Sequence, residues 1–367
     1  MIPIERVEKL DPARLLRRDA QAEADVSAAV DDVIEAVRTR GDEALRDYTR
    51  RFDGAELTDL RVTEAEIQAA WEATDADFRQ TLELAAENIR AFHSRQIHSD
   101  FVLTREGGIV MGQRYTPIEK VGVCVPRSPV AFPSTILMNV IPAKLAGVQD
   151  IVLVTPPEAD GSVSPAALAY GTESVPKVDK IVGPGGVFVA AAKRKVFGQV
   201  AIDMIAGPSE ILVLSDGRSN PAWVAADLLS QAEHDVHASA VLVTDSMDLA
   251  QAVQKEVEAQ LEQLPRRDIA RKSLETNGRI FVTSSLEEAA EAANVIAPEH
   301  LELCVDDPFA LLSRVRNAGS IFLGRSAPEA LGDYYAGPNH TLPTSGTARF
   351  SSPLSVDDFV KKSSFLY

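Results

Sequence analysis

The first hundred residues carry apolar side chains at the spacing of helices. Residues 22–40 place an apolar side chain at every third or fourth position, and Gly41 ends this pattern with a residue that suits a helix C-terminus. A shorter helical pattern follows up to Gly54. Thr63 and Glu66 have the spacing of a capping box, and a long helical pattern runs from there to about residue 94. We therefore predict a mainly helical N-terminal segment.

The pattern of hydrophobic residues changes after this segment. Two runs, 101–104 and 109–115, flank a turn around Gly107-Gly108 and predict a hairpin. From residue 121 onwards, short apolar runs alternate with helical patterns. Strands are predicted at 121–125, 150–155, 180–182, 200–204, 210–214, 239–244, 279–282, 301–305 and 319–323. Helices are predicted at 133–147, 186–197, 222–234, 246–263, 285–296 and 307–315. Apolar strands that alternate with helices form covered parallel sheets, so the sequence predicts an α/β fold.

The composition indicates a globular protein of about two domains. The chain has 367 residues, of which 45% are hydrophobic and 25% are charged. Its 54 acidic and 37 basic residues give a net charge of −17, which disfavours nucleic acid and anionic membranes as partners. Because no run has the length of a membrane span or the form of a signal peptide, we expect a cytoplasmic protein. The two cysteines, Cys124 and Cys304, lie in apolar runs and are predicted to be buried thiols, not a disulfide or metal site.

A glycine-rich segment, Gly183 to Gly186, lies between a predicted strand and a predicted helix. A helix that starts there can bind phosphate through its first N–H groups. The dinucleotide-binding fingerprint requires a third glycine where Phe188 stands, so the motif is incomplete. A tight turn between strand and helix is the simpler interpretation, and both remain open at this point.

Gln231 and His234 lie three residues apart at the end of a predicted helix, so they share one of its faces. An imidazole and an amide oxygen in this arrangement can both reach one metal ion. The alternative is an ordinary helix end, because histidine is favoured at helix C-termini in any case.

Two further segments add polar side chains of the same chemistry. Glu299 and His300 directly precede a predicted strand, and Asp333 and His340 lie in a loop rich in glycine and proline. Loops at strand ends carry the sites of α/β folds, although a polar turn also explains Glu299 and His300. Nitrogen and oxygen donors without thiolates suit a catalytic zinc ion. Three other histidines are interpreted as ordinary helix or surface residues: His93, His98 and His237.

The chain resembles the histidinol dehydrogenase family nearly from end to end. The similar segments include VIEAVRTRGDEAL at 33–45, IDMIAGPSEIL at 202–212 and GDYYAGPNH at 332–340. Others lie at 48–54, 133–139, 180–185, 229–234 and 297–302. The family oxidises L-histidinol to L-histidine in two NAD-dependent steps, through a bound aldehyde and with one zinc ion per subunit. The resemblance implies the same activity here, in a homodimer.

The resemblance also implies roles for individual residues. Gln231, His234 and Asp333 correspond to zinc ligands, and the zinc in turn holds the substrate. His300 corresponds to the general base that accepts the alcohol proton and contacts the substrate. Glu299 corresponds to the residue that activates water in the second oxidation. Two further substrate contacts are implied, Ser209 and His340.

The sequence departs from the family pattern in three places. The family continues beyond the position of Tyr367 into a helical tail that supplies a glutamate and a fourth zinc ligand, so we expect weaker zinc binding and a weaker dimer. Near Pro165 a strand, a helix and a glutamine that contacts NAD are missing. The family's cofactor positions are also changed, with Cys124 for tyrosine, Arg127-Ser128 for paired glycines, and Gly186 for asparagine.

The resemblance implies two Rossmann-like domains that are discontinuous in sequence. We expect residues 21–120 and 212–355 to form the domain with the zinc and base residues, and 121–211 to form a reduced second domain. Residues 1–20 would be an N-terminal segment and 356–367 the stub of the tail. Three functions are compatible with this pattern: an active histidinol dehydrogenase, a homologue that binds zinc or an imidazole without hydride transfer, and a dehydrogenase of another alcohol.

Overall fold

The computed structural model describes residues 1–7, 10–11, 15, 26–126, 132–157 and 164–367, and within them it confirms the predicted α/β fold. The chain divides into two compact units. The first consists of Met1–Gln21, Ala206–Gly332 and Leu342–Pro353. The second consists of Ala22–Ile205, Asp333–Thr341 and Leu354–Tyr367.

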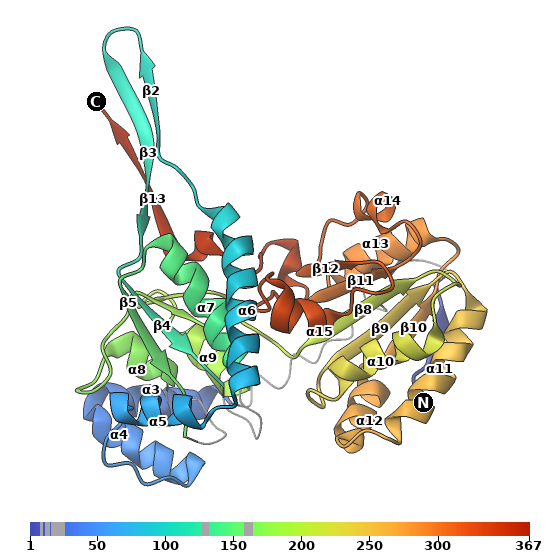
Figure 1. The fold of residues 1–367 in the computed structure, drawn as a ribbon, viewed down its shortest axis with the longest axis horizontal. Coiled ribbons are helices and arrows are strands. Elements are labelled where there is room, and N and C mark those ends of the chain that lie inside the picture. The colour runs from blue at the N-terminus through green and yellow to red at the C-terminus, as the bar shows by residue number, and fades with distance from the viewer. Residues whose placement is uncertain (8–9, 12–14, 16–25, 127–131, 158–163) are drawn as a thin grey trace. The chain divides into compact units, whose positions relative to one another are not determined.

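The first unit is built on a parallel sheet (Figure 1). In the described part of the chain its order is β1-β10-β9-β8-β11-β12, and each neighbouring pair is parallel. The bounds are β1 Ile4–Arg6, β8 Glu210–Ser215, β9 Ser239–Thr244, β10 Arg279–Val282, β11 His300–Cys304 and β12 Ser320–Leu323. From β8 the chain adds strands first on one side and then on the other, which is the order of a Rossmann fold.

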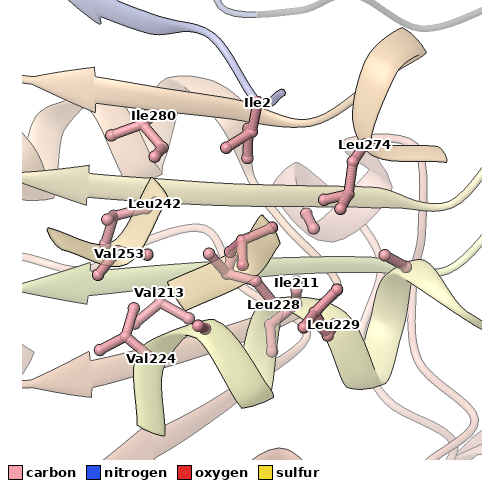
Figure 2. Close-up of a cluster of buried hydrophobic side chains, with 14 of the residues drawn as sticks. Ile2, Ile211, Val213, Val224, Leu228, Leu229, Leu242, Val253, Leu274 and Ile280 are labelled. Carbon is pink, nitrogen blue, oxygen red and sulfur yellow. The ribbon is translucent and has the colours of Figure 1, made fainter. Parts of the chain in front are cut away.

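Helices cover both faces of this sheet. One face packs on α10 (Pro221–Ala232), α11 (Met247–Leu261) and α12 (Arg267–Thr276), and the other on α13 (Leu286–Ile296) and α14 (Pro308–Leu312). Figure 2 shows the first core, where Ile211 and Val213 of β8 meet Leu228 of α10. Leu212 and Leu214 point to the other core, because successive residues of a strand face opposite sides. The remaining short elements here are α15 (Glu329–Leu331), a π-helical turn η3 (Gly332–Ala336) that crosses into the second unit, and η4 (Thr347–Arg349).

The second unit contains a smaller parallel sheet of order β5-β4-β6-β7. The strands are β4 Lys120–Cys124, β5 Asp150–Val154, β6 Lys180–Val182 and β7 Ala201–Ile202. One face packs on α3 (Ser27–Arg40), α4 (Asp42–Tyr48), α8 (Ser164–Tyr170) and α9 (Val187–Val196). The other packs on α7 (Pro133–Ala146) and on η5 (Val356–Phe359). The other helical elements are η1 (Thr49–Asp53), α5 (Glu64–Ala73), α6 (Ala76–His93) and η2 (Ser94–Gln96).

A three-stranded antiparallel sheet extends from the second unit (Figure 1). It contains the predicted hairpin, β2 (Phe101–Arg105) and β3 (Ile109–Pro117), and a third strand, β13 (Val360–Leu366), that pairs with β3. Residues 356–367 were expected to be the stub of a tail, whereas they form η5 and β13 in the structure.

The boundaries of the two units differ from the predicted ones. Residues 26–120 belong with β4–β7 and not with the sheet of the first unit. The physical reason is the core of the second unit, in which Val30, Val33 and Val37 of α3 pack with Leu168 of α8 and Ile181 of β6.

Candidate active site

Five of the predicted site residues come to the amino edge of the first unit's sheet. Ser209 precedes β8, and Glu299 and His300 lie at the start of β11, its parallel neighbour. Because α10 connects β8 to the parallel strand β9, it runs back towards the amino edge, where Gln231 and His234 lie at its end. The sequence predicted a site at strand ends, and these residues lie at the amino ends of β8 and β11. This is the opposite edge from the one that open α/β sheets ordinarily use.

His300 is almost fully buried, with 3% of its surface exposed. Its Nδ1 lies 3.0 Å from the backbone oxygen of Glu210. A carbonyl oxygen only accepts hydrogen bonds, so Nδ1 carries the proton and Nε2 is the basic nitrogen. The Nε2 atom lies 4.0 Å from Oε1 of Glu329, and the ring lies against Phe322 with a centroid distance of 6.1 Å.

Glu299 is buried beside His300. Its Oε2 accepts a hydrogen bond of 2.9 Å from the backbone N–H of Glu210 and lies 3.7 Å from Nδ1 of His300. Both residues are thus tied to the first residue of β8, one through its N–H and the other through its carbonyl. The arrangement fixes the two side chains relative to the strand.

Gln231 supplies a test of the predicted metal site. Its side chain is 1% exposed, and Oε1 is one of three buried side-chain atoms in the described residues without a hydrogen-bond partner, together with Asn139 Oδ1 and Thr341 Oγ1. A buried amide oxygen without a donor is costly unless a cation or water occupies the position next to it. His234 is exposed at the end of the same helix, and its carbonyl accepts a hydrogen bond from Arg266. The donor types therefore fit a zinc ion.

The other two predicted residues belong to the second unit. Asp333 is half-buried. It directly follows Gly332, where the chain passes from the first unit to the second. His340 is also half-buried, and its Nε2 lies 3.2 Å from the hydroxyl oxygen of Ser134 at the start of α7. The structure therefore gives each of them a defined local environment.

Asn339 anchors the loop that carries His340, and one of its contacts is His93, which was predicted to be an ordinary helix or surface residue. The Asn339 amide donates to the carbonyl of Met138 at 2.6 Å and lies 3.5 Å from Nε2 of His93. His93 ends α6 and is fully buried, with Nδ1 2.6 Å from Oε1 of Gln96. His93 is therefore a helix residue, one of the two predicted alternatives, but it does not lie on the surface. Its spacing of four residues from Ile89, and of eight from Ala85, places it on the buried face of α6, and this periodicity could have indicated its burial.

Three carboxylic acids near His300 were also missed. Glu302 follows His300 by two residues on β11, so both side chains point to the same face of the sheet. Asp227 of α10 hydrogen-bonds Glu302, and Glu329 of α15 faces His300. Glu302 lies within the segment 297–302, but its partners on α10 and α15 become visible only in the folded structure.

The glycine-rich segment of the second unit forms a tight turn between β6 and α9. Gly183 has a φ of +105°, and a Cβ atom there would collide with the carbonyl oxygen of Cys124. Its N–H donates to Oδ2 of Asp203 at 2.8 Å, and Lys193 donates to its carbonyl at 3.0 Å. These contacts support the interpretation as a tight turn. Gly186 has no such constraint, since a Cβ atom there meets nothing within 4 Å.

A hollow of about 670 Å³ lies at the carboxyl ends of β4 and β5. Its walls are mainly apolar, with a few polar side chains. The lining residues are Leu57, Asp59, Leu60, Arg61, Val62, Glu66, Val125, Pro126, Phe132, Pro133, Ile136, Leu153, Thr155, Pro156 and Pro157. The carboxyl edge of a doubly wound sheet is the usual place for a nucleotide. At the corresponding edge of the first unit, Arg325 forms ion pairs with Asp216 and Asp306.

Comparison with known proteins identifies relatives over most of the chain. The family model described as histidinol dehydrogenase matches residues 16–168 and 164–367. A histidinol dehydrogenase of Halalkalibacterium halodurans is 53% identical over 375 residues, which cover 96% of this chain and 88% of the relative. One of Geobacillus kaustophilus is 52% identical over 385 residues, covering 98% and 91%. The crystal structure of histidinol dehydrogenase from Elizabethkingia anophelis has a TM-score of 0.95 at 38% identity, covering 100% of this chain and 90% of that one.

The chain belongs to the histidinol dehydrogenase family. The alignments with both relatives are longer than the 367 residues of this chain, so some of the relatives' residues have no counterpart here. The family match is interrupted at residues 164–168, at the start of α8, where the sequence predicts a missing stretch.

Two of the altered cofactor positions lie in the described part of the structure. Cys124, at the end of β4, is buried, and burial raises the pKa of its thiol to about 12. It is therefore not a reactive thiolate at neutral pH. Gly186 is the N-cap residue of α9. Arg127 and Ser128 lie outside the described residues.

No helix in the described part of this family member is long and apolar enough to cross a membrane.

Proposed function

We propose that this protein oxidises L-histidinol to L-histidine with NAD as the electron acceptor. The observation that carries the proposal is the tautomer of His300. Its Nδ1–H is committed to the Glu210 carbonyl, which leaves Nε2 as a base in a buried site at the amino edge of the sheet. The names of the relatives and the similarity of the fold support the same reaction.

The proposed zinc ligands are Gln231, His234 and Asp333, and the unpartnered Oε1 of Gln231 supports this assignment. A bound zinc ion would orient the substrate and polarise its alcohol. Ser209 and His340 are the proposed substrate contacts.

In the first oxidation, His300 accepts the hydroxyl proton of histidinol at Nε2 while the carbon-bound hydrogen leaves with its electron pair for the nicotinamide, which gives the aldehyde. In the second, Glu299 accepts a proton from water, and the water oxygen bonds to the aldehyde carbon. The carbon-bound hydrogen of this hydrate then passes as a second hydride to a second NAD, and loss of a proton gives the carboxylate. Glu299 suits this role because its position is fixed by the N–H of Glu210.

NAD is proposed to bind at the carboxyl edge of the second unit's sheet. The hollow beside Val125, Leu153 and Thr155 supports this, as does the turn from Gly183 to α9, whose first N–H groups suit a phosphate. The altered residues Cys124 and Gly186 are the proposed cofactor positions of this chain.

A homodimer and a cytoplasmic location stay predictions from the sequence. The three-stranded antiparallel sheet supports self-association, because side chains of β2 and β13 such as Val102 and Leu366 are exposed and apolar. Sedimentation of the purified protein tests the dimer, and a purely monomeric species would contradict it.

The proposal is tested by following NADH absorbance with zinc-loaded protein, L-histidinol and NAD. We expect NADH formation from the wild type, and a loss of at least about a hundredfold in kcat for His300→Ala because the proton acceptor is gone. Zinc content and thermal unfolding of the variant serve as controls for folding. No NADH from the zinc-loaded wild type would contradict the proposal.

The changes at residues 124 and 186 favour a second candidate, a protein that binds zinc and an imidazole ligand without hydride transfer. It predicts that histidinol stabilises the zinc-loaded protein, by about 2.7 kcal/mol at a hundredfold excess over Kd. It also predicts that calorimetry detects no NAD binding. Measurable heat of NAD binding would reject this candidate in favour of the dehydrogenase.

A further inference from the structure

Three carboxyl groups of the first unit meet on the face of the sheet that His300 occupies. Glu302 lies two residues after His300 on β11, Asp227 comes from α10, and Glu329 begins α15. Glu302 is 1% exposed and Glu329 is also buried. Buried carboxyl groups are costly unless each has hydrogen-bond partners, so their arrangement requires an explanation.

The carboxyls of Asp227 and Glu302 are hydrogen-bonded to each other. Two ionised carboxylates repel and neither has a proton to donate, so this bond requires that one of them is protonated. Burial, followed by the nearby charge of Asp227, raises the pKa of Glu302 to about 9. Burial also raises the pKa of Asp227, to about 6. At neutral pH the pair therefore holds one proton, and burial favours it on Glu302, which is 1% exposed while Asp227 is half-buried.

The second oxygen of Glu302 holds the start of α15. Its Oε1 accepts a hydrogen bond of 2.8 Å from the backbone N–H of Glu329. α15 is a single turn from Glu329 to Leu331, and its own helical bonds are too few to fix its first residue. The bond to Glu302 therefore fixes the backbone of Glu329, the residue from which the carboxylate side chain extends.

The side chain of Glu329 is directed by this backbone position. The hydroxyl of Ser230 on α10 donates to its Oε2 at 3.3 Å, and its Oε1 lies 4.0 Å from Nε2 of His300. Because Nε2 is the basic nitrogen, a carboxylate opposite it stabilises the imidazolium that forms when His300 takes up a proton.

We propose that Asp227 and Glu302 are positioning residues, a carboxyl pair that shares one proton and fixes the start of α15 so that Glu329 stays opposite Nε2 of His300. The proposal rests on the proposed function in one respect, the role of His300 as the base. The pair itself touches neither substrate nor cofactor. Its neutral member can be replaced by an amide of the same shape, and this gives the proposal a specific test.

The test compares Glu302→Gln with Glu302→Leu. Glutamine still donates to Asp227 and accepts from the Glu329 N–H, whereas leucine keeps the volume and removes both bonds. Asp216→Asn is the matched control, since Asp216 is a buried carboxyl at the opposite edge of the same sheet. Hydrogen exchange of the Glu329 amide and steady-state kinetics are measured for all variants with equal zinc content.

We expect the Glu329 amide to exchange at the wild-type rate in Glu302→Gln and about tenfold or more faster in Glu302→Leu. We expect kcat within about threefold of the wild type for Glu302→Gln, and reduced at least about tenfold for Glu302→Leu with KM within about threefold. The control should change stability and leave kcat unchanged. A purely structural role predicts equal kcat for all folded variants.

Unchanged protection of the Glu329 amide in Glu302→Leu, or an unchanged kcat, would overturn the proposal. If Glu302→Leu does not fold, Asp227→Ala tests the same bond from the other side, and the same two readouts apply. Absence of activity in the wild type would contradict the proposed function. The exchange measurement would still decide whether Glu302 fixes α15, so the two failures are distinguishable.

Discussion

At the scale of single residues, the two-residue period of β11 organises the site. His300, Glu302 and Cys304 point to the face covered by α10, while Leu301 and Leu303 enter the opposite core. His300 was proposed as the base because the segment 297–302 resembles the family, since its place at a strand start also fits an ordinary polar turn. Glu302 could not be predicted, because its partners come from helices that are distant in sequence.

Gly186→Asn is expected to fit and to strengthen NAD binding. The residue has a φ of −65°, and a Cβ atom would have no neighbour within 4 Å, so the unfolding temperature should change by less than about 2 °C. An added amide that hydrogen-bonds the cofactor is worth about 1 kcal/mol, or about fivefold in Kd measured by calorimetry. Gly183→Asn is the matched control and should destabilise, because its φ is +105° and Cβ collides with Cys124. An unchanged Kd in Gly186→Asn would remove this position from the proposed cofactor site.

His93 should make folding stability depend on pH. Burial lowers the pKa of His93, so the unfolded chain binds a proton more readily than the folded one. Its contribution is therefore fully present above the ordinary value of about 6.5 and is lost as pH falls below it. We expect the free energy of unfolding to fall less between pH 7.5 and 5.5 in His93→Gln than in the wild type, by urea denaturation. An identical fall in both proteins would contradict this.

At the scale of elements, local signals predicted those that are stabilised locally. Thr63 and Glu66 form both bonds of the predicted capping box at the start of α5. The long helix predicted there is interrupted, because Asp75 caps a separate helix, α6. β13 was missed because its exposed sequence does not alternate and its partner β3 is more than 240 residues away.

Asp75→Ala should destabilise the second unit by about 1 kcal/mol, the usual effect of removing an N-cap. The Asp75 carboxylate accepts from the N–H groups of Asp77 and Phe78 at the start of α6, the helix that ends at His93. Urea denaturation gives the change in free energy, and Asp77→Ala, which removes an exposed charge in the same turn, is the control. Equal stability of Asp75→Ala and the wild type would show that tertiary packing alone holds α6 in place.

At the scale of the whole molecule, the alternation of strands and helices predicted the α/β class, and the resemblance predicted two Rossmann-like sheets. The boundaries could not be predicted, since the N-terminal helices join the sheet of the second unit through contacts between α3, α8 and β6. The amino-edge position of Glu299 and His300 follows from the direction of α10 and β11, which becomes visible only once the strand order is known.

The central claim is that the buried His300 serves an oxidation that takes four electrons from histidinol. The most direct measurement is the amount of NADH formed from a limiting amount of L-histidinol by the zinc-loaded protein. The account predicts about two NADH for each histidinol at the endpoint of the wild-type reaction, and an initial rate at least about a hundredfold lower in His300→Ala. An endpoint without NADH in the wild type, or equal initial rates in both proteins, would contradict it.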